Sequence, residues 1–249
     1  MKDGSLGLVI IPTYNEIYNI ERLSREIMAI TSDVDVLIID DNSPDGTGRM
    51  ADVLSEENER IFALHRECKQ GLASAYLMGF SWALARDYSY FIQMDADFSH
   101  QPRDLPNLIT GLEKADVVIG SRLIKGGMII GRPFYRNLLT KWGAIYTRKL
   151  LGFPVRDATA GFKAISKEMA EELDFASFRS KGYAFQIELL WQLKKAGARI
   201  IEVPIIFQER ASGVSKMSWR IAIEAWTIVL RLRLSQQEMK VRSLFRLRP

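Results

Sequence analysis

Short runs of apolar residues alternate along the first half of the chain with longer stretches that have helical spacing. The apolar runs, which predict buried strands, lie at residues 6–12, 35–40, 61–66, 90–94 and 116–120. The stretches that predict helices lie at residues 19–30, from 46 onward, at 72–86 and at 105–115. This alternation predicts βαβ units. Because the strands lack a polar face, we expect an α/β fold whose mostly parallel central sheet has helices on both faces.

The pattern is less regular in the second half of the chain. A basic segment rich in glycine, residues 121–136, predicts a mobile loop, and residues 156–166 combine turn and strand signals. Residues 198–210 predict one strand, in which Pro204 indicates a sheet edge or a bulge. Further helices are predicted at residues 137–151 and 182–197. No repeat or low-complexity linker divides these 249 residues, so we expect one large domain with appendages.

The C-terminal part predicts a separate amphipathic element. Residues 217–234 contain the apolar stretch WRIAIEAWTIVLRLRL, which is too short and too charged to span a membrane. Its aromatic residues and arginines suit a helix at a membrane interface, and packing on the catalytic domain or on a partner subunit is an equal alternative. We therefore divide the chain into a catalytic domain (1–216), this helix (217–234) and a basic tail (235–249).

Charge and cysteine content narrow the function classes. The net charge is +4, yet the residues from Arg231 to the end carry six basic side chains and one acid, which leaves −1 for the rest. The tail is either solvated and disordered or meets an anionic surface, and it lacks a nucleic-acid recognition motif, so no nucleic-acid partner is expected. The single Cys68 excludes an internal disulfide and suits a reducing compartment. With only two histidines, a zinc site is not expected.

Polar clusters follow four of the predicted strands. They lie at residues 12–16, 40–46, 95–100 and 120–122. Ligands of open α/β sheets bind at the carboxyl ends of the strands, so these clusters predict one site. The dinucleotide and P-loop glycine motifs are absent. Asp95 and Asp97 at a strand end could form a turn, but in this context they favour Mg²⁺ or Mn²⁺, which take carboxylates together with substrate phosphates.

Eight motifs recur in the order of a known family. They are IPTYNE (11–16), IIDDNSPDGT (38–47), QGLASAY (70–76), MDADFSH (94–100), GSR (120–122), DATAGFKA (157–164), GYAFQIEL (182–189) and ERASGVSKMS (209–218). Together they resemble a family-two glycosyltransferase of the GT-A fold. More narrowly, they resemble dolichyl- or polyprenyl-phosphate mannose synthases, and most of all the bacterial polyprenol-phosphate mannose synthase domains.

The resemblance implies roles for individual residues. The implied donor-binding residues are Pro12, Tyr14, Glu16, Ile39, Asp41, Asp95, Ala96, Asp97, Arg210 and Lys216. The implied metal ligands are Asp95, Asp97 and Ser99, the implied acceptor-phosphate residues are Arg122 and Arg136, and the implied catalytic residues are Asp97 and Arg122. Some relatives carry glutamine at the place of Ser99, so water or His100 would complete the metal shell.

Each of these residues also has a purely structural interpretation. Asp40 and Asp41 could cap the turn before the second helix, and Glu16 could cap the first. Tyr14 could pack at the rim of the site. Arg122 and Arg136 could be surface charges. The sequence offers no contact for Asp157.

The expected reaction transfers mannose from GDP-mannose to dolichyl or polyprenyl phosphate. A phosphate monoester has a second pKa of about 6, so its oxygen is already nucleophilic near neutral pH and needs no dedicated base. We expect in-line attack with inversion, at a peripheral position on the cytoplasmic face of the membrane, with a membrane-anchoring subunit as a further partner. The alternatives are a UDP-glucose-dependent enzyme of the same class and a non-enzymatic subunit that retains the fold.

Overall fold

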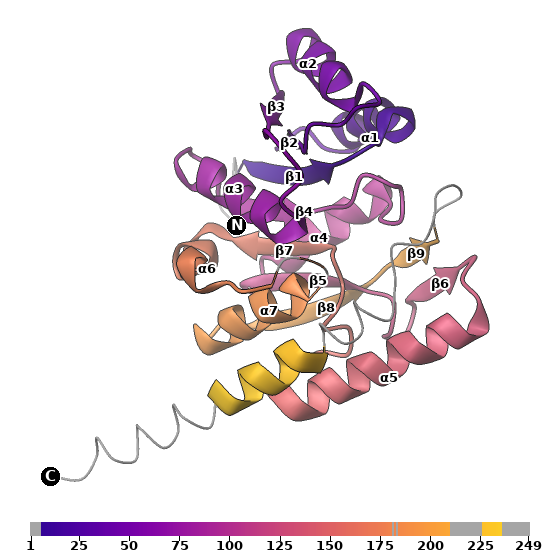
Figure 1. Ribbon diagram of the computed structural model, residues 1–249, viewed down its shortest axis with the longest axis vertical. Coiled ribbons are helices and arrows are strands. Elements are labelled where there is room, and N and C mark those ends of the chain that lie inside the picture. The colour runs from indigo at the N-terminus through magenta and orange to yellow at the C-terminus, as the bar shows by residue number, and fades with distance from the viewer. Residues whose placement is uncertain (1–5, 181, 183, 210–225, 236–249) are drawn as a thin grey trace, which may run out of the picture.

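The computed structural model describes residues 6–180, 182, 184–209 and 226–235 (Figure 1). Within them the strands are β1 (Gly7–Thr13), β2 (Val34–Asp40), β3 (Ile61–His65), β4 (Tyr90–Gln93), β5 (Val117–Ser121), β6 (Met128–Ile130), β7 (Lys163–Ser166), β8 (Ile200–Pro204) and β9 (Ile206–Gln208). The α-helices with assigned bounds are α1 (Ile17–Ile30), α2 (Thr47–Glu57), α3 (Leu72–Leu84), α4 (Leu105–Gly111), α5 (Phe134–Leu151), α6 (Lys167–Glu171) and α7 (Phe185–Lys195), with short 3₁₀ turns at Pro102–Asp104 and Phe175–Ser177. Residues 226–235 are also helical.

The central sheet has the strand order β3-β2-β1-β4-β7-β5-β8. Its neighbours pair in parallel except where β7 pairs antiparallel with both β4 and β5. The predicted α/β fold with a mostly parallel sheet is therefore confirmed. β7 lies in the segment from which the sequence predicted only mixed turn and strand signals, and it reverses direction between two parallel neighbours.

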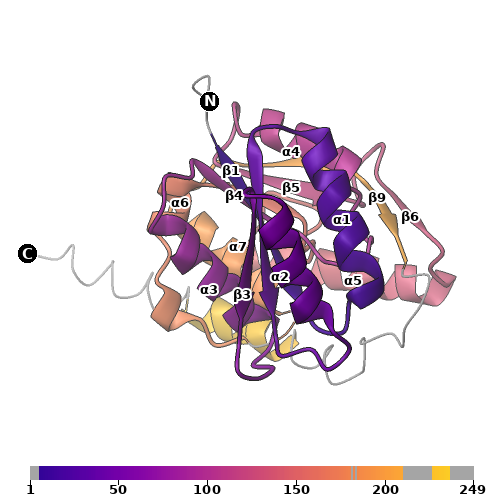
Figure 2. The ribbon, with the colours of Figure 1, turned by 90° about the horizontal axis from the view of Figure 1, so that it is seen from above.

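Alternate residues of β1 enter two different hydrophobic cores. Leu8 and Ile10 pack with α3, α6 and α7, whereas Val9 and Ile11 pack with α1, α2 and α4. Figure 2 shows α1 and α3 on opposite sides of the strands. Both faces are covered because side chains of a strand alternate with period two and both sets are apolar here. Helices on both faces of the sheet are thus confirmed.

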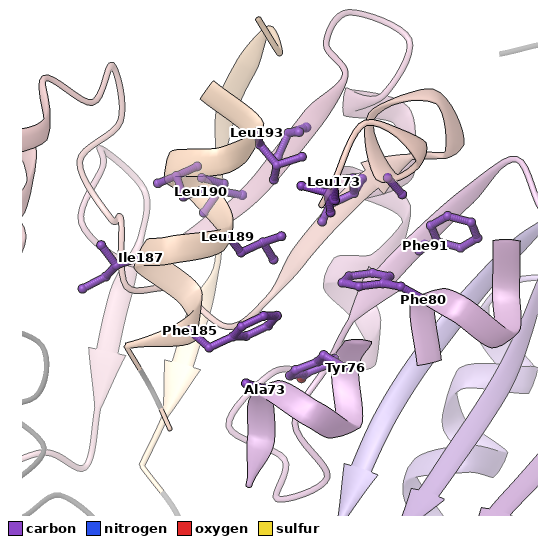
Figure 3. Close-up of a cluster of buried hydrophobic side chains, with 14 of the residues drawn as sticks. Ala73, Tyr76, Phe80, Phe91, Leu173, Phe185, Ile187, Leu189, Leu190 and Leu193 are labelled. Carbon is purple, nitrogen blue, oxygen red and sulfur yellow. The ribbon is translucent and has the colours of Figure 1, made fainter. Parts of the chain in front are cut away.

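Aromatic side chains join α3 to α7 within the first core (Figure 3). The rings of Tyr76 and Phe185 are stacked with centroids 6.0 Å apart, and both side chains are fully buried. Phe80 lies one turn further along α3 against Phe91 of β4. Burial of each such side chain contributes about 1.5–3 kcal/mol, so these contacts hold α7 against α3, and α3 against the strand that leads to Asp95.

Two predictions for the second half were wrong in detail. The expected mobile loop at 121–136 contains β6, and the expected single strand at 198–210 is divided into β8 and β9 by Ile205. β6 and β9 form a separate parallel pair, with Ile130 opposite Gln208. The edge position predicted from Pro204 is confirmed, because β8 is the last strand of the central sheet.

The longest helix, α5, lies at one end of the molecule beside the 226–235 helix, drawn in yellow in Figure 1. The rings of Tyr146 and Trp226 are stacked at 4.9 Å, and Val229 and Leu232 are buried in the first core. The described part of the C-terminal helix therefore packs on the domain. No helix among the described residues has the length and hydrophobicity needed to cross a bilayer.

Candidate active site

The polar loops after β1, β2, β4 and β5 share one edge of the sheet, because these strands run in the same direction. Three of the loops contain a non-glycine residue with positive φ: Asn15 (61°), Asn42 (57°) and Phe98 (57°). No other non-glycine residue of the described chain has a positive φ. Such backbone conformations cost energy and concentrate at functional sites. The edge predicted from the sequence is therefore also where the backbone is most constrained.

The loop after β4 holds Asp95 and Asp97 in place through local contacts. The backbone N–H of Asp95 donates to Nδ1 of His100 at 3.2 Å, and the hydroxyl of Tyr76 lies 3.5 Å from Asp95 Oδ1. The backbone N–H of Ser99 donates to Asp97 Oδ1 at 3.0 Å. Both residues are partly exposed, although Asp97 Oδ2 is buried. Hard divalent cations accept this donor type and complete their shell with phosphate oxygens and water.

His100 lies beneath this loop and is unsuited to metal binding. Its ring stacks on Phe162 at 5.0 Å and meets Phe207 edge-on at 5.9 Å. Burial lowers the pKa of His100, against the opposing charges of Asp95 and Asp97. Because Nδ1 accepts a hydrogen bond, the neutral ring carries its proton on Nε2 and has no second lone pair for a cation. Of the two further ligands predicted, water or His100, this hydrogen bond favours water.

Within the described residues, the candidate metal ligands at this site with a carboxylate group are Asp95 and Asp97. No group of three or more histidine, cysteine, aspartate or glutamate side chains suited to a metal occurs among them. Ser99 is buried, and its backbone carbonyl accepts from the N–H of Gln208 at 3.3 Å, so the loop is tied to β9. A hydroxyl ligand from Ser99 stays a prediction. The donor set fits Mg²⁺ or Mn²⁺ held mainly by Asp95, Asp97 and a substrate diphosphate.

Aromatic and charged side chains gather at the ends of β1 and β2. The ammonium of Lys69 lies 3.7 Å from the ring centroid of Tyr14. Asp41 forms a buried ion pair with Arg66 at 3.0 Å. Burial raises the pKa of the Asp41 carboxyl, and the positive charges of Arg66 and Lys69 oppose that rise. The sequence predicted Tyr14 and Asp41 but missed Arg66 and Lys69, which carry no motif of their own.

Other predicted residues of this edge have structural contacts. Asp40 accepts hydrogen bonds from the hydroxyl of Thr13 at 3.0 Å and from the backbone N–H of Ser43 at 2.9 Å, which supports its structural interpretation. Glu16 occupies the N-cap position of α1, but its side chain makes no capping hydrogen bond and instead accepts from Asn19 Nδ2 at 2.9 Å. Pro12 and Ile39 are paired across β1 and β2, with Pro12 partly exposed, and Ala96 is buried between the two aspartates.

Arg122, which follows β5, is held by a fully buried aspartate. Its Nε and Nη2 donate to Asp157 Oδ2 and Oδ1 at 2.8 and 3.2 Å, and Nη2 also lies 3.2 Å from Thr159 Oγ1. Burial disfavours the Asp157 anion, but the charge and hydrogen bonds of Arg122 hold its pKa below the ordinary value. This pair gives Asp157 the contact that the sequence did not supply. Arg122 is thus a positioned cation rather than a free surface charge.

A fully buried lysine, Lys163, lies on β7. Lys163 Nζ donates to Gln186 Oε1 at 2.7 Å and to the carbonyl oxygen of Ala160. Burial, together with the charge of Arg122, lowers its pKa to about 7, while the charges of Asp157 and Asp95 act in the opposite direction. Lys163 therefore interacts electrostatically both with the Arg122–Asp157 pair and with Asp95.

Two further arginines share one glutamate. Arg132 Nε contacts Glu209 Oε2, and Arg136 Nη1 lies 2.6 Å from Glu209 Oε1. The guanidinium carbons of Arg122 and Arg132 lie 4.8 and 4.9 Å from the centroid of the Phe207 ring. Since that ring also touches His100, the arginines lie beside the Asp95 loop. The sequence predicted Arg122 and Arg136 but missed Arg132, which looked like any basic residue of a glycine-rich loop.

The structure thus gathers the predicted residues around one edge, except two. Arg210 and Lys216 lie outside the described residues, so their predicted contacts with phosphates remain predictions.

Comparisons with known proteins identify the family of the chain. A sequence model of glycosyl transferase family 2 matches residues 8–174. An undecaprenyl-phosphate mannosyltransferase of Micrococcus luteus is 43% identical over 224 residues, which cover 90% of this chain and 92% of that protein. A polyprenol monophosphomannose synthase of Mycolicibacterium smegmatis is 45% identical over 213 residues, with 85% and 80% covered. A dolichol-phosphate mannosyltransferase of Pyrococcus furiosus is 36% identical, and the match covers 90% of this chain and 62% of that protein.

Solved structures share the fold. A crystal structure of glucosyl-3-phosphoglycerate synthase from Mycobacterium tuberculosis, in complex with Mn²⁺, UDP-glucose and phosphoglyceric acid, aligns with a TM-score of 0.67 at 20% identity. The alignment covers 93% of this chain and 81% of that one. At this identity the likeness supports the architecture alone.

Proposed function

Because the chain belongs to glycosyl transferase family 2, we propose that it transfers mannose from GDP-mannose to a polyprenyl or dolichyl phosphate. The relatives at 43% and 45% identity, whose names specify polyprenyl-type acceptors and mannose, support this acceptor and this sugar. The observation that carries the proposal is the junction at Phe207. There Phe207 contacts His100, which holds the Asp95 loop, and also the guanidinium groups of Arg122 and Arg132. This arrangement offers one place for a metal-bound diphosphate and another for a second phosphate.

The donor nucleotide would bind at the ends of β1, β2 and β4. Tyr14 and Asp41 suit contacts to the nucleoside, because one offers an aromatic face and the other a carboxylate that can accept hydrogen bonds. Pro12, Glu16 and Ile39 would line the same end of the sheet, and Ala96 with Asp95 and Asp97 would face the diphosphate. Arg210 and Lys216 keep the phosphate contacts predicted from the resemblance.

Asp95 and Asp97 would hold Mg²⁺ or Mn²⁺, with Ser99 beside them. Bound there, the cation would act as a Lewis acid that neutralises the departing diphosphate. Around it the chain fixes geometry: His100 holds the backbone of Asp95, and Ser99 holds the carboxylate of Asp97. Catalysis would then depend mainly on positioning and electrostatics.

Arg122 and Arg136 would receive the acceptor phosphate. Arginine suits this task because its planar fork matches phosphate oxygens. Asp157 holds the Arg122 guanidinium in one orientation, so little rotamer entropy is lost when phosphate binds. The phosphate oxygen is ionised near neutral pH and can attack the sugar carbon opposite the diphosphate without a protein base, which would invert that centre.

The outer face of α5 supports a position on a membrane surface. Six of its large apolar side chains are exposed, whereas its buried positions are Thr140, Ala144, Thr147 and Leu151. The exposed apolar residues are Phe134, Tyr135, Leu138, Leu139, Trp142 and Ile145 on α5, Met128 and Ile130 on β6, and Trp226, Leu230 and Leu234 on the neighbouring helix. Large apolar side chains exposed in this number on neighbouring elements indicate an interaction surface.

Charge selects an anionic bilayer as the occupant of this face. The sequence of α5 contains four basic residues and no acid, and residues 226–235 add two arginines and no acid. A second copy would bring like charges together, whereas each basic residue near an anionic membrane contributes about 1 kcal/mol. The face continues to Arg136, so the chain of a bound lipid phosphate would leave the site beside the bilayer. The cytoplasmic side and a membrane-anchoring subunit stay predictions, as does the division of the chain at residues 216 and 234.

Transfer from radiolabelled GDP-mannose to a short polyprenyl phosphate in detergent tests the reaction. Mg²⁺ and Mn²⁺ are compared with EDTA, and labelled UDP-glucose is run beside GDP-mannose. Metal-dependent label in the lipid from GDP-mannose alone is the expected result. Transfer from UDP-glucose alone would keep the mechanism and overturn the sugar, and absence of transfer from both would favour a non-enzymatic subunit.

Sedimentation with lipid vesicles tests the membrane surface. Trp142→Glu should weaken binding to vesicles that contain phosphatidylglycerol, and pure phosphatidylcholine should bind wild type less. Tyr18→Glu is the matched control, because Tyr18 is 96% exposed on α1, away from this face. Equal binding by the two variants would contradict the assignment, and a dimer that Trp142→Glu dissociates would assign the face to a second copy.

A further inference from the structure

Glu209 pairs with Arg136, which is assigned above to the acceptor phosphate, and with the neighbouring Arg132. Each of its carboxylate oxygens meets a different guanidinium, Arg132 at Oε2 and Arg136 at Oε1. A phosphate that approaches these arginines therefore meets an anion already bound there. Neither Glu209 nor Arg132 was among the residues to which the resemblance gave a role.

The small parallel sheet explains why these groups meet. Strands β6 and β9 end side by side, with Ile130 opposite Gln208. In a parallel pair, the residues that follow the two strands leave the sheet at the same end. Glu209 follows β9 directly and donates its backbone N–H to the carbonyl of Ile130 at 2.9 Å, and Arg132 follows β6 by two residues. The contact is thus built by the chain topology, although the two residues are 77 positions apart.

The two carboxylates of the arginine cluster differ in how firmly they are held. Asp157 is fully buried, and its backbone N–H donates to Glu202 Oε1 at 2.9 Å, so its grip on Arg122 belongs to the core. The side chain of Glu209 is 20% exposed, and those of Arg132 and Arg136 are 9% and 17% exposed. Solvent therefore reaches the carboxylate of Glu209 but not that of Asp157.

The charges at Arg132 and Arg136 also favour replacement of the Glu209 carboxylate by a phosphate. Burial disfavours the Glu209 anion, yet the hydrogen bond and charges of Arg132 and Arg136 hold its pKa below the ordinary value, so it is ionised near neutral pH. Burial lowers the pKa of Arg132, and the neighbouring charges of Arg122 and Arg136 add to that effect. Three arginines and two carboxylates leave one net positive charge. A phosphate dianion satisfies the two arginines better than a single carboxylate does, because it has three oxygens and two charges.

We propose that Glu209 is a built-in competitor that occupies Arg132 and Arg136 until the acceptor phosphate displaces it, which makes Arg132 a further acceptor-binding residue. This inference rests on the proposed function, because it takes the second phosphate to be that of the acceptor. Glu209 would keep the arginines together and neutralised in the free protein. Its cost would be a weaker apparent affinity for the acceptor.

The KM for a short polyprenyl phosphate in Glu209→Gln tests the proposal. The amide keeps the shape and removes the charge, so the KM for acceptor should fall by about threefold to tenfold while the KM for GDP-mannose stays unchanged. Glu57→Gln is the matched control, because Glu57 also pairs with an arginine, Arg25, but on α2. It makes the same change in net charge and should leave both KM values unchanged.

Arg132→Gln gives the opposite sign. It should raise the KM for acceptor by about tenfold without changing the KM for donor. If Glu209→Gln fails to fold, Glu209→Asp replaces it: the side chain is one methylene shorter, keeps its charge and cannot reach both arginines, so a smaller fall in KM is expected. An unchanged or higher KM for acceptor in the Glu209 variants would overturn the proposal in favour of a purely organising role.

A binding measurement separates this inference from the proposed function. Inorganic sulfate is a dianion whose charge does not change near neutral pH, so calorimetry with sulfate reports the arginines without any transfer reaction. Glu209→Gln should bind sulfate more tightly than wild type, and Arg132→Gln more weakly. If Glu209→Gln binds sulfate more tightly but the wild-type protein transfers no sugar, the competitor role of Glu209 is supported and the proposed transferase function is overturned. If the wild-type protein transfers mannose but Glu209→Gln changes neither sulfate binding nor KM, the function is supported and the competitor role is overturned.

Discussion

The pair between Arg122 and Asp157 allows a stability prediction that depends on burial alone. Asp157→Asn keeps the shape of the side chain and removes its charge, which leaves the Arg122 guanidinium without its counter-ion. The Arg122 side chain is 11% exposed and that of Asp157 is 0% exposed. Water can therefore replace little of what the carboxylate provides.

The magnitude follows from the cost of an uncompensated buried charge. Removal of one partner of a buried ion pair typically costs about 3–5 kcal/mol. Because Arg122 keeps a small contact with solvent and a hydrogen bond to Thr159, we expect the lower end, about 3 kcal/mol. Loss of orientation in Arg122 should also lower kcat for transfer.

A matched pair elsewhere in the chain provides the control. Asp116 and Arg199 meet with the same fork geometry, at 3.0 and 3.3 Å, but the arginine side chain is 70% exposed. Asp116→Asn should therefore cost at most about 1 kcal/mol. Urea unfolding of both variants gives the two values, and the double variant Asp157→Asn with Arg122→Gln should regain much of the loss, because no lone charge remains. Equal losses for Asp157→Asn and Asp116→Asn would refute the reasoning.

Three further outcomes test the Asp95 loop. Asp97→Ala should reduce transfer by about a hundredfold or more with little change in the urea midpoint, because a strand-end carboxylate makes few core contacts; a matching loss of stability would contradict this role. Burial lowers the pKa of His100 below 6.5, so its contribution to stability is complete above that pH and is lost as the pH falls. His100→Asn should therefore flatten the decline of the urea midpoint between pH 7.5 and 5.5. An unchanged decline in the variant would count against this reasoning. Gly161→Ala places a Cβ 3.3 Å from His100 Cε1 and 3.6 Å from Asp95 Oδ2. We expect this variant to lose more transfer activity than thermal stability. A larger loss of thermal stability than of activity would indicate a packing role for Gly161.

Local signals in the sequence were sufficient for the frame of the molecule. Uninterrupted apolar runs predict strands buried on both faces, and β1, β2, β4 and β5 lie where those runs occur. The polar clusters could be assigned to one edge because parallel strands end on the same side. The antiparallel direction of β7, the strand β6 and the pairing of β6 with β9 were not predicted, since strands of three or four residues carry too little periodicity.

The sequence by itself therefore determined the α/β architecture and the place of the site, along with Asp95, Asp97, Arg122 and Arg136 as its candidates. Only the tertiary structure decided which charges face one another. Asp157 meets Arg122 across 35 residues, and Glu209 meets Arg132 across 77. The reason is physical: strand patterns and turns arise from neighbours along the chain, whereas an ion pair depends on which loops the completed sheets bring together, and no local pattern records that distance.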